Sequence, residues 1–240
     1  MFDGMVGNNM VKDKLKAFIL HFLISVALMF MATIVIFFVW YPSPYHHLFH
    51  VETIFFMMVA IDVILGPLLT LIVYKKGKKT LKADLTIIVM VQLLAFLWGF
   101  WQISTARPAW LVLYKDTIYA VSPSLINNQQ QKQMSVFKQN WGKPKLVMVD
   151  NHQPMTEVIF SEQKYQPYTA EQAKQYLLPL SQVKDYQPKL YDQIRLTHPK
   201  AKAYFPIVTE ASLDIPLLLM DSHAQPIATT LAKFDDAQTK

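Results

Sequence analysis

The sequence predicts a membrane protein in which a bundle of three transmembrane helices is followed by a small α+β domain. Hydrophobic residues make up 52% of the 240 residues, and the mean hydropathy is +0.21, which is too apolar for an ordinary soluble chain. The apolar residues gather in three long runs, at 17–40, 53–74 and 85–103. Residues 107–240 instead mix short β-rich runs with polar stretches and many prolines, as in a small domain with irregular connections.

Each of the three runs is long enough to cross a bilayer as a helix. Residues 17–40 span about 36 Å at 1.5 Å per residue. A cleaved secretory signal is shorter and ends at small residues, whereas this run ends in the bulky sequence FFVWYPSPY, so we expect it to remain as an anchor. The second run carries Asp62 as its one charge, and the third carries Gln92 as its main polar interruption.

The lysines predict the orientation of these helices, because positively charged segments resist translocation. Residues 1–16 hold three lysines ahead of the first run, and the loop between the second and third runs holds five more, whereas residues 41–52 have no Lys or Arg. We therefore expect 1–16 to be a cytoplasmic tail and 17–106 to hold the three crossings. Residues 107–240 then lie on the far side of the membrane.

The far-side segment shows strand and helix signals of a compact α+β domain. We expect one hairpin from Trp110–Tyr114 and Ile118–Val121, and a second from 215–220 and 226–232 around Asp221–Gln225. Short strands are expected at 145–150 and 156–160, and a loop or short helix at 127–133. Thr169 and Gln172 have the spacing of a capping box, which predicts a helix running to about Leu178 before Pro179.

Composition excludes several chemistries. Gly142 is the only glycine in 107–240, and both phosphate-binding loops and dinucleotide fingerprints need several. The chain has no cysteine, which excludes disulfides and zinc–thiolate sites. The pI of about 9.3 comes partly from the membrane-flanking lysines, and without a basic stripe we expect no nucleic-acid partner. We also expect no cofactor.

Three histidines near the first loop raise the question of a metal site. His46 and His50 could share a helix face, with His47 between them, but no third anionic ligand stands at a matching spacing. We favour histidines that lie at the membrane interface among aromatic residues, and we expect no metal.

Asp62 admits four interpretations. A protease dyad would need a second carboxylate beside it, and Asp84 lies about 18 Å away along the helix direction. Ion transport would need more polar residues along a route. The acid could instead fix helix packing by bonding to Gln92 or Trp98 or by staying protonated, or it could keep that bond for a partner's transmembrane helix.

Gly66 and Pro67 follow one turn after Asp62. Proline cannot donate its backbone N–H and crowds the preceding turn, so a kink is expected, and Gly66 allows a close helix approach. This is either a packing kink or a groove for a partner.

The membrane-embedded part resembles a known family. The sequences FFVWYPSPY, IDVILGPLLTLIVY and LKADLTIIVMVQLLAFLWGFWQISTARPAWLVLY occur in order between residues 14 and 114 and are similar to type IV pilin accessory proteins of the TfpX/TfpZ kind from gram-negative bacteria. Ser43 stands where glycine is common in that family. The resemblance implies a non-enzymatic protein of the bacterial inner membrane, with a periplasmic domain at 107–240, that acts on its cognate pilin or on the pilus machinery.

The resemblance also suggests how a partner would bind. We expect the second span around Asp62 to Pro67 to pack on the hydrophobic stem of the major pilin, while residues from Arg107 onward touch its head; the assembly platform is the other candidate partner. The positions expected to bind a partner or pack helices are Asp62, Gly66, Pro67, Gln92, Arg107, Pro108 and Trp110.

Two other classes of function stay open. A small membrane enzyme that modifies pilin or lipid would need polar groups that converge at the outer face, and the candidates are scattered: Arg107, Asp116, His152 and His198. A membrane-tethered sensor would need a separate output partner, because the inner segments are short.

Overall fold

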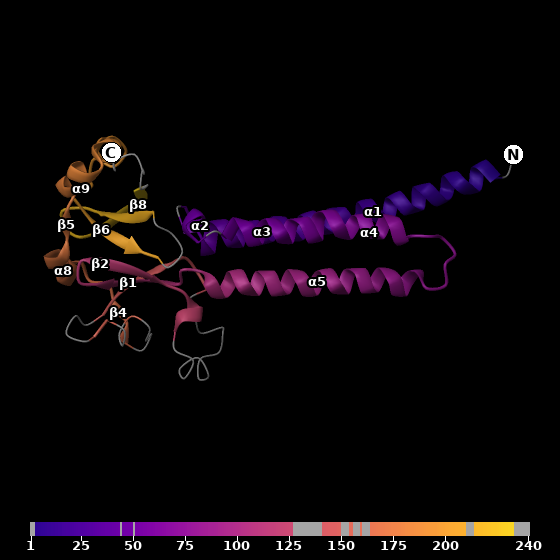
Figure 1. Cartoon of the computed structure of the whole chain (residues 1–240), viewed down its shortest axis with the longest axis horizontal. Coiled ribbons are helices and arrows are strands. Elements are labelled where there is room, and N and C mark those ends of the chain that lie inside the picture. Colours follow the sequence, from indigo (N-terminus) through magenta and orange to yellow (C-terminus); the bar gives the residue numbers. More distant parts are fainter. Residues whose placement is uncertain are drawn as a thin grey trace, which may run out of the picture. The chain divides into compact units, whose positions relative to one another are not determined.

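The computed structural model describes residues 3–43, 45–49, 51–126, 141–149, 154–155, 159, 164–209 and 214–232. The chain forms two compact units. The helical unit contains Met1–Ile36 and Val51–Ser104, and the sheet unit contains Phe37–His50 and Thr105–Lys240. Residues 37–50 therefore belong with the sheet unit, although the sequence predicts that 37–40 end the first span and that 41–50 lie in the loop after it. Figure 1 shows the helices and strands of both units.

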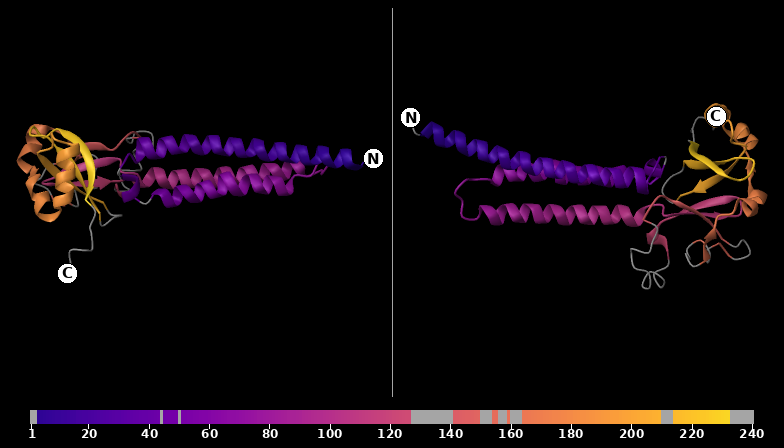
Figure 2. Two further views of the ribbon diagram at one scale, coloured as in Figure 1. Left: turned by 90° about the horizontal axis from the view of Figure 1, so that it is seen from above. Right: turned by 180° about the vertical axis from the view of Figure 1, so that it is seen from behind.

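The helical unit contains three long helical stretches. The first is α1 (Asp3–Thr33), which continues as a π-helical segment, Ile34–Trp40. The second consists of α3 (Val51–Val59), the π-helical segment η2 (Ala60–Leu65) and α4 (Gly66–Val73). The third is α5 (Leu81–Ala106). Within this unit α1 packs along η2 and α4, and Figure 2 shows the same helices from two further sides.

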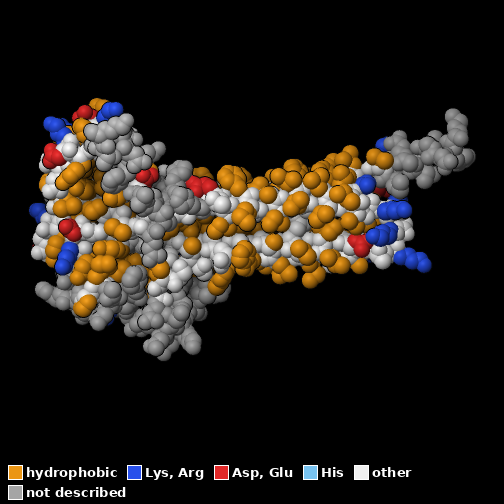
Figure 3. Space-filling view, viewed as in Figure 1, with side chains coloured by type: hydrophobic (Ala, Val, Ile, Leu, Met, Phe, Trp, Pro, Cys, Tyr) orange, Lys and Arg blue, Asp and Glu red, His pale blue; other side chains and the backbone are white. Residues whose placement is uncertain are grey.

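Three helices among the described residues are long and apolar enough to cross a membrane, at Val11–Trp40, Val51–Val73 and Leu81–Ala106. This confirms the prediction of three membrane-compatible helices. Their outer surfaces are covered with exposed apolar side chains such as Phe30, Ile72 and Leu94. Figure 3 shows these hydrophobic side chains along the helices and the lysines gathered at one end. At that end Lys76 pairs with Asp13 at 2.5 Å and Lys78 with Asp84 at 2.6 Å.

The second helical stretch changes its geometry where the sequence predicts a kink. Pro67 occupies the first turn of α4, and the π-helical turns of η2 come directly before it. A proline has no N–H to donate and its ring crowds the preceding carbonyls. A π-helical turn is one of the local adjustments that accommodate such a residue, and such turns are frequent at functional sites.

The described strands of the sheet unit form one mixed, eight-stranded sheet with the order β4-β3-β1-β2-β6-β7-β8, in which β5 also pairs with β6. The N-terminal strands are β1 (Trp110–Tyr114), β2 (Thr117–Val121), β3 (Lys145–Met148) and β4 (Gln166–Pro167). The C-terminal ones are β5 (Leu178–Pro179), β6 (Ala203–Val208), β7 (Ile215–Met220) and β8 (Pro226–Ala232). Strand β1 pairs antiparallel with β2 but parallel with β3, and β2 pairs parallel with β6. A mixed-sheet domain follows the helices, as expected.

Short helices accompany the strands of this unit. They are α2 (Tyr45–Leu48), α8 (Ala170–Ala173), α9 (Ser181–Tyr186) and α10 (Pro188–Thr197), with 3₁₀ turns at Pro123–Leu125 and Lys174–Tyr176. One core cluster lies on the strands around Trp110, Val112 and Val147. Another is formed where Val183 of α9 and Ile194 of α10 meet Leu219 of β7.

Both predicted hairpins are confirmed, because β1 pairs with β2 and β7 with β8 in antiparallel register. The strand predicted at 145–150 is β3, which ends at Met148. The predicted loop at 127–133 lies outside the described residues, as do all residues of the predicted strand at 156–160 except Ile159.

The helix predicted from Thr169 to Leu178 is wrong in length. It has one α-helical turn, Ala170–Ala173, then a 3₁₀ turn, and Leu178 already pairs in β5 with Tyr204 of β6. The capping box does not form, because the Thr169 hydroxyl donates to Gln172 Oε1 at 2.8 Å and no side chain caps the helix. Strand pairing to β6 outweighs the local helical preference, which is a weak determinant in short segments.

Candidate functional site

The polar side chains of the three long helices meet in one place inside the helical unit. Asp62 lies in η2 and is 3% exposed, and Gln92 lies in α5 and is 8% exposed. Thr70 of α4 is also buried, and its hydroxyl lies 2.7 Å from His21 Nδ1 of α1. The sequence separates these residues by up to 71 positions, and the packing of the helices brings them to one cavity. We call this group, His21, Asp62, Thr70 and Gln92, the polar floor.

Gln92 holds the third helical stretch against the second. Its side-chain amide nitrogen donates to the backbone oxygen of Asp62 at 3.2 Å and lies 3.5 Å from that of Ile61. Both carbonyls belong to the π-helical turn, where the usual i→i−4 bonds are displaced. The Ile61 oxygen already accepts the Gly66 N–H, whereas the residue five positions after Asp62 is Pro67, which has no N–H. Gln92 therefore supplies a donor to the Asp62 carbonyl that the helix itself leaves without one.

Two glycines allow the second and third helical stretches to approach each other closely, Gly66 in α4 and Gly99 in α5. A Cβ placed on Gly66 would collide with the amide group of Gln92. A Cβ placed on Gly99 of α5 would lie 2.9 Å from the sulfur of Met58 in α3. Small residues at helix contacts are a recurrent feature of membrane bundles, because they let backbones come close.

One of the interpretations of Asp62 is that its carboxyl bonds to Gln92 or Trp98. In the structure the Gln92 amide nitrogen donates to the Asp62 backbone oxygen at 3.2 Å, and Trp98 is 66% exposed. Among the described residues neither carboxyl oxygen of Asp62 has a hydrogen-bond partner, and Gln92 Oε1 has none either. An unsatisfied polar group in an apolar interior is costly, which makes Asp62 a candidate functional residue.

Gly66 and Pro67 are both buried. The surface that Gly66 offers is taken up by Gln92 of the same chain. The structure therefore places the Gly66–Pro67 pair in the packing of the bundle, not on a face open to another molecule.

The polar floor lies at a cavity of about 380 Å³ between α1 and α5. Its walls are apolar side chains of the two helices, among them Ile24, Leu28, Val89 and Leu93. Ile24, Val89 and Leu93 are also roughly half exposed on the outer surface of the unit. The cavity is thus a groove that opens from the polar floor toward the surroundings of the helices, and we call it the α1–α5 groove.

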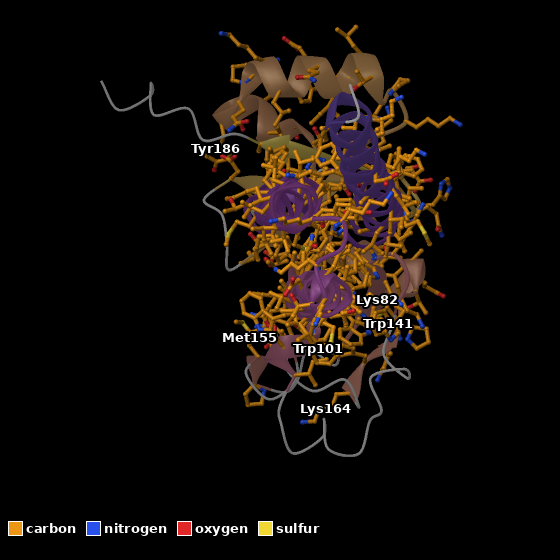
Figure 4. The ribbon with its side chains drawn as sticks, turned by 90° about the vertical axis from the view of Figure 1, so that its right-hand side faces the viewer. Lys82, Trp101, Trp141, Met155, Lys164 and Tyr186 are labelled. Carbon is orange, nitrogen blue, oxygen red and sulfur yellow. The ribbon has the colours of Figure 1, made fainter. Side chains whose placement is uncertain are left out.

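The other predicted site residues lie together in the sheet unit. Arg107 is 2% exposed, and its guanidinium carbon lies 4.8 Å from the ring centre of Trp141 and 5.5 Å from that of Trp40. The Trp40 indole N–H donates to the Trp141 backbone oxygen at 3.0 Å. Trp141 is labelled in Figure 4. Cation–π contacts of this kind are strongest when water is excluded.

Burial also shifts the pKa values of Arg107 and of Tyr41, which belongs to the same cluster as Trp40 and Trp141. It lowers the pKa of Arg107 from its ordinary value, and it raises the pKa of the neighbouring Tyr41 hydroxyl against the opposing effect of the Arg107 charge. Tyr41 is 1% exposed. At neutral pH the cluster therefore holds a neutral tyrosine beside a cationic guanidinium.

Pro108 and Trp110 are buried next to this cluster. The Trp110 ring packs edge-on against Tyr165, with ring centres 6.0 Å apart. The side chains of Arg107, Pro108 and Trp110 are therefore packing positions of the sheet unit and are not on its surface. If another protein binds to the segment that begins at Arg107, it has to contact side chains other than these three.

Sequence reasoning missed three residues that contact or surround the predicted site residues: His21, Thr70 and Trp141. His21 and Thr70 are visible only as polar interruptions of apolar runs, and nothing in their spacing pairs them. Trp141 belongs to no recognisable motif, yet it covers Arg107 from 34 residues away. No group of three or more His, Asp or Glu that could hold a metal occurs within the described parts of the chain, and the side chains of His47 and His50 are not among those described.

Comparison with known proteins finds relatives in one family. Residues 9–49 match the model of the family described as fimbrial assembly protein FimB. The chain is 38% identical over 105 residues to three fimbrial assembly proteins of Dichelobacter nodosus. The match covers 43% of this chain and 80% of the protein from serogroups C1 and C2. It covers 41% of the proteins from serogroups I and E1, so the chain matches less than half of their length. No solved structure matches.

Proposed function

Because the chain belongs to the fimbrial assembly protein family, we propose that it is an accessory factor of type IV pili in the bacterial inner membrane, acting on the cognate pilin or on the pilus machinery. The observation that carries the proposal is the similarity to the serogroup C1 and C2 fimbrial assembly protein, of which the match covers 80%. The TfpX/TfpZ kind of accessory protein, to which the three sequence motifs point, is the finer assignment that we propose within it.

The helices support a place in a membrane. Three of them have the length and apolar surface of membrane spans, and the lysines of 75–82 lie at the end of the bundle where Lys76 meets Asp13. Positive charge is retained on the cytoplasmic side. We propose that this end faces the cytoplasm and that the sheet unit lies in the periplasm, where exported pilus subunits carry their globular heads.

The proposed role is non-enzymatic: the protein modulates pilin assembly or pilus dynamics through contact. Arg107, the strongest polar candidate near the membrane boundary, is covered by two indole rings, so its burial argues against a reacting group at the surface. The polar floor likewise suits recognition, because it offers hydrogen-bonding atoms in an apolar groove and no pair of neighbouring carboxylates.

Gene deletion tests this function. Cells that lack the protein should show a changed amount of surface pili, measured by shearing the cells and quantifying pilin, while total pilin stays constant. Re-expression of the full chain should restore the wild-type level. Replacing the cognate pilin with a foreign one should weaken the dependence if pilin is the partner, and should leave it intact if the assembly platform is. Unchanged surface pili in the deletion strain would refute the proposed role.

A further inference from the structure

The α1–α5 groove is long enough to bind several turns of another helix. Its lining runs from Ala17 to Leu28 on α1 and from Leu85 to Phe96 on α5. The eleven steps from the first to the last lining residue of each helix correspond to about 16 Å, or three turns. The two sides of the groove are helices that are roughly half exposed, and its base is also helical. A fourth helix in a four-helix bundle packs against neighbours arranged in this way.

The floor of this groove contains buried oxygens that receive no hydrogen bond from the residues that the structure describes. Its three unpartnered atoms among the described residues are both carboxyl oxygens of Asp62 and Oε1 of Gln92. Even if the carboxyl carries a proton, two of these three oxygens act only as acceptors. An occupant that satisfies them has to bring donors, and elsewhere it has to be apolar to match the walls.

We propose that the α1–α5 groove binds the transmembrane helix of a pilus subunit, with a hydrogen-bond donor of that helix facing Asp62 and Gln92. This inference rests on the proposed function and names the place and chemistry of the contact. In hydrocarbon such a bond is favoured because the alternative is an unsatisfied polar group. The contact is made by side chains of α1 and α5 over a floor from η2, and not by Gly66 and Pro67.

Two other occupants fit the groove less well. A lipid tail matches the apolar walls but supplies no donor to the floor. A permeating cation would pair with Asp62, but a route for it needs polar groups along its length. Apart from the polar floor, Ser25 is the one polar residue among the described residues that line the groove.

The absence of cysteine in the chain makes a direct test simple. Val89 lines the groove, whereas Val91, two residues further along α5, does not; their exposed fractions are 50% and 60%. The full-length variants Val89→Cys and Val91→Cys are each expressed in piliated cells with the cognate pilin carrying one cysteine at successive positions of its membrane helix. Mild oxidation of the membranes then forms disulfides between neighbouring cysteines.

We expect Val89→Cys to cross-link to pilin at least tenfold more than Val91→Cys, with maxima every three to four positions along the pilin helix. Leu93→Cys in the groove and Leu94→Cys outside it provide a second matched pair. Equal cross-linking from both members of the pairs, or none from the groove positions, overturns the inference. If the deletion strain still shows altered surface pili in that case, the proposed function stands and only the groove is refuted.

The polar floor is tested separately. Asp62→Leu should lower the Val89→Cys cross-link at least tenfold while the protein remains folded, and Asp62→Asn, which keeps an acceptor, should retain most of it. Val89→Trp should block the groove and change the amount of surface pili in the same direction as the gene deletion, whereas Val91→Trp should leave it at the wild-type level. Undiminished cross-linking in Asp62→Leu shows that the carboxyl does not recognise the helix, and normal piliation with Val89→Trp shows that the groove is not used.

Discussion

The amide group of Gln92 occupies the space that a side chain at position 66 would need. Gly66 lies at the start of α4, and a Cβ there would collide with the Gln92 side chain of α5, whose nitrogen donates to the Asp62 backbone oxygen at 3.2 Å. One glycine and one glutamine thus join the second and third helical stretches directly beside the buried Asp62. Several consequences can be measured.

Replacing Gly66 with alanine should destabilise the helical unit more than the same change at Gly99. At Gly66 the new methyl group displaces an amide that is bonded to the helix backbone, and overpacking costs about 1–3 kcal/mol. At Gly99 it meets Cγ and Sδ of the flexible Met58 side chain at 2.8 and 2.9 Å, a smaller overlap than with the Gln92 amide nitrogen at Gly66. The cost at Gly99 should therefore be lower, at about 1 kcal/mol. Thermal unfolding of the two purified full-length variants in detergent, followed by circular dichroism, compares them. Equal midpoints would contradict the tight fit at Gly66.

Asp62→Leu should make the isolated protein more stable. The substitution removes two buried oxygens that have no partner among the described residues, and a buried unsatisfied polar group costs about 1–3 kcal/mol. Gln92→Leu is the matched control, because it deprives backbone carbonyls of a donor and should cost about 1 kcal/mol. Both effects are read from unfolding midpoints in detergent. A destabilised Asp62→Leu protein would show that the carboxyl is required for the fold itself.

Arg107→Lys should destabilise the sheet unit although the charge is kept. The guanidinium lies over the rings of Trp40 and Trp141, and an ammonium has no planar face for two such contacts, so a loss of about 1–2 kcal/mol is expected. Tryptophan fluorescence during urea unfolding measures it. Arg195→Lys on the exposed side of α10 is the control and should change nothing measurable.

The sheet unit should lose stability above about pH 10, in part through Tyr168. Burial, and secondarily the charge of Asp221, raises the pKa of Tyr168 to about 12, and its hydroxyl donates to the Ala224 backbone oxygen at 2.5 Å. A group whose folded pKa is raised contributes stability that is complete below its unfolded pKa, about 10, and is lost as the pH rises through the folded value.

Tyr168→Phe checks this dependence. At pH 7 the variant should be less stable by about 1 kcal/mol, because a hydrogen bond is lost. Between pH 10 and 12 its stability should fall less than that of the wild type, so that the two unfolding midpoints converge. Parallel pH profiles would show that another group causes the alkaline loss.

Much of the architecture could be predicted from the sequence, because the signals involved are local. Three apolar runs of sufficient length predict three membrane-compatible helices, whatever the helices pack against. The two hairpins follow from β-rich runs on either side of short turns, as in Trp110–Tyr114 with Thr117–Val121. Asp62 and Gln92 could also be identified as candidates, because a polar residue in an apolar run is visible without any structure.

The tertiary structure alone decided which groups meet. Leu178 pairs with Tyr204 in place of ending a helix, because strand pairing with a distant segment outweighs a short local preference. Arg107 is enclosed by Trp40 and Trp141, and Gln92 lies on Gly66, because side chains far apart in the chain converge only when the helices and the sheet pack. The groove above Asp62 has the same origin: it is the space left between α1 and α5, and no single stretch of sequence encodes it.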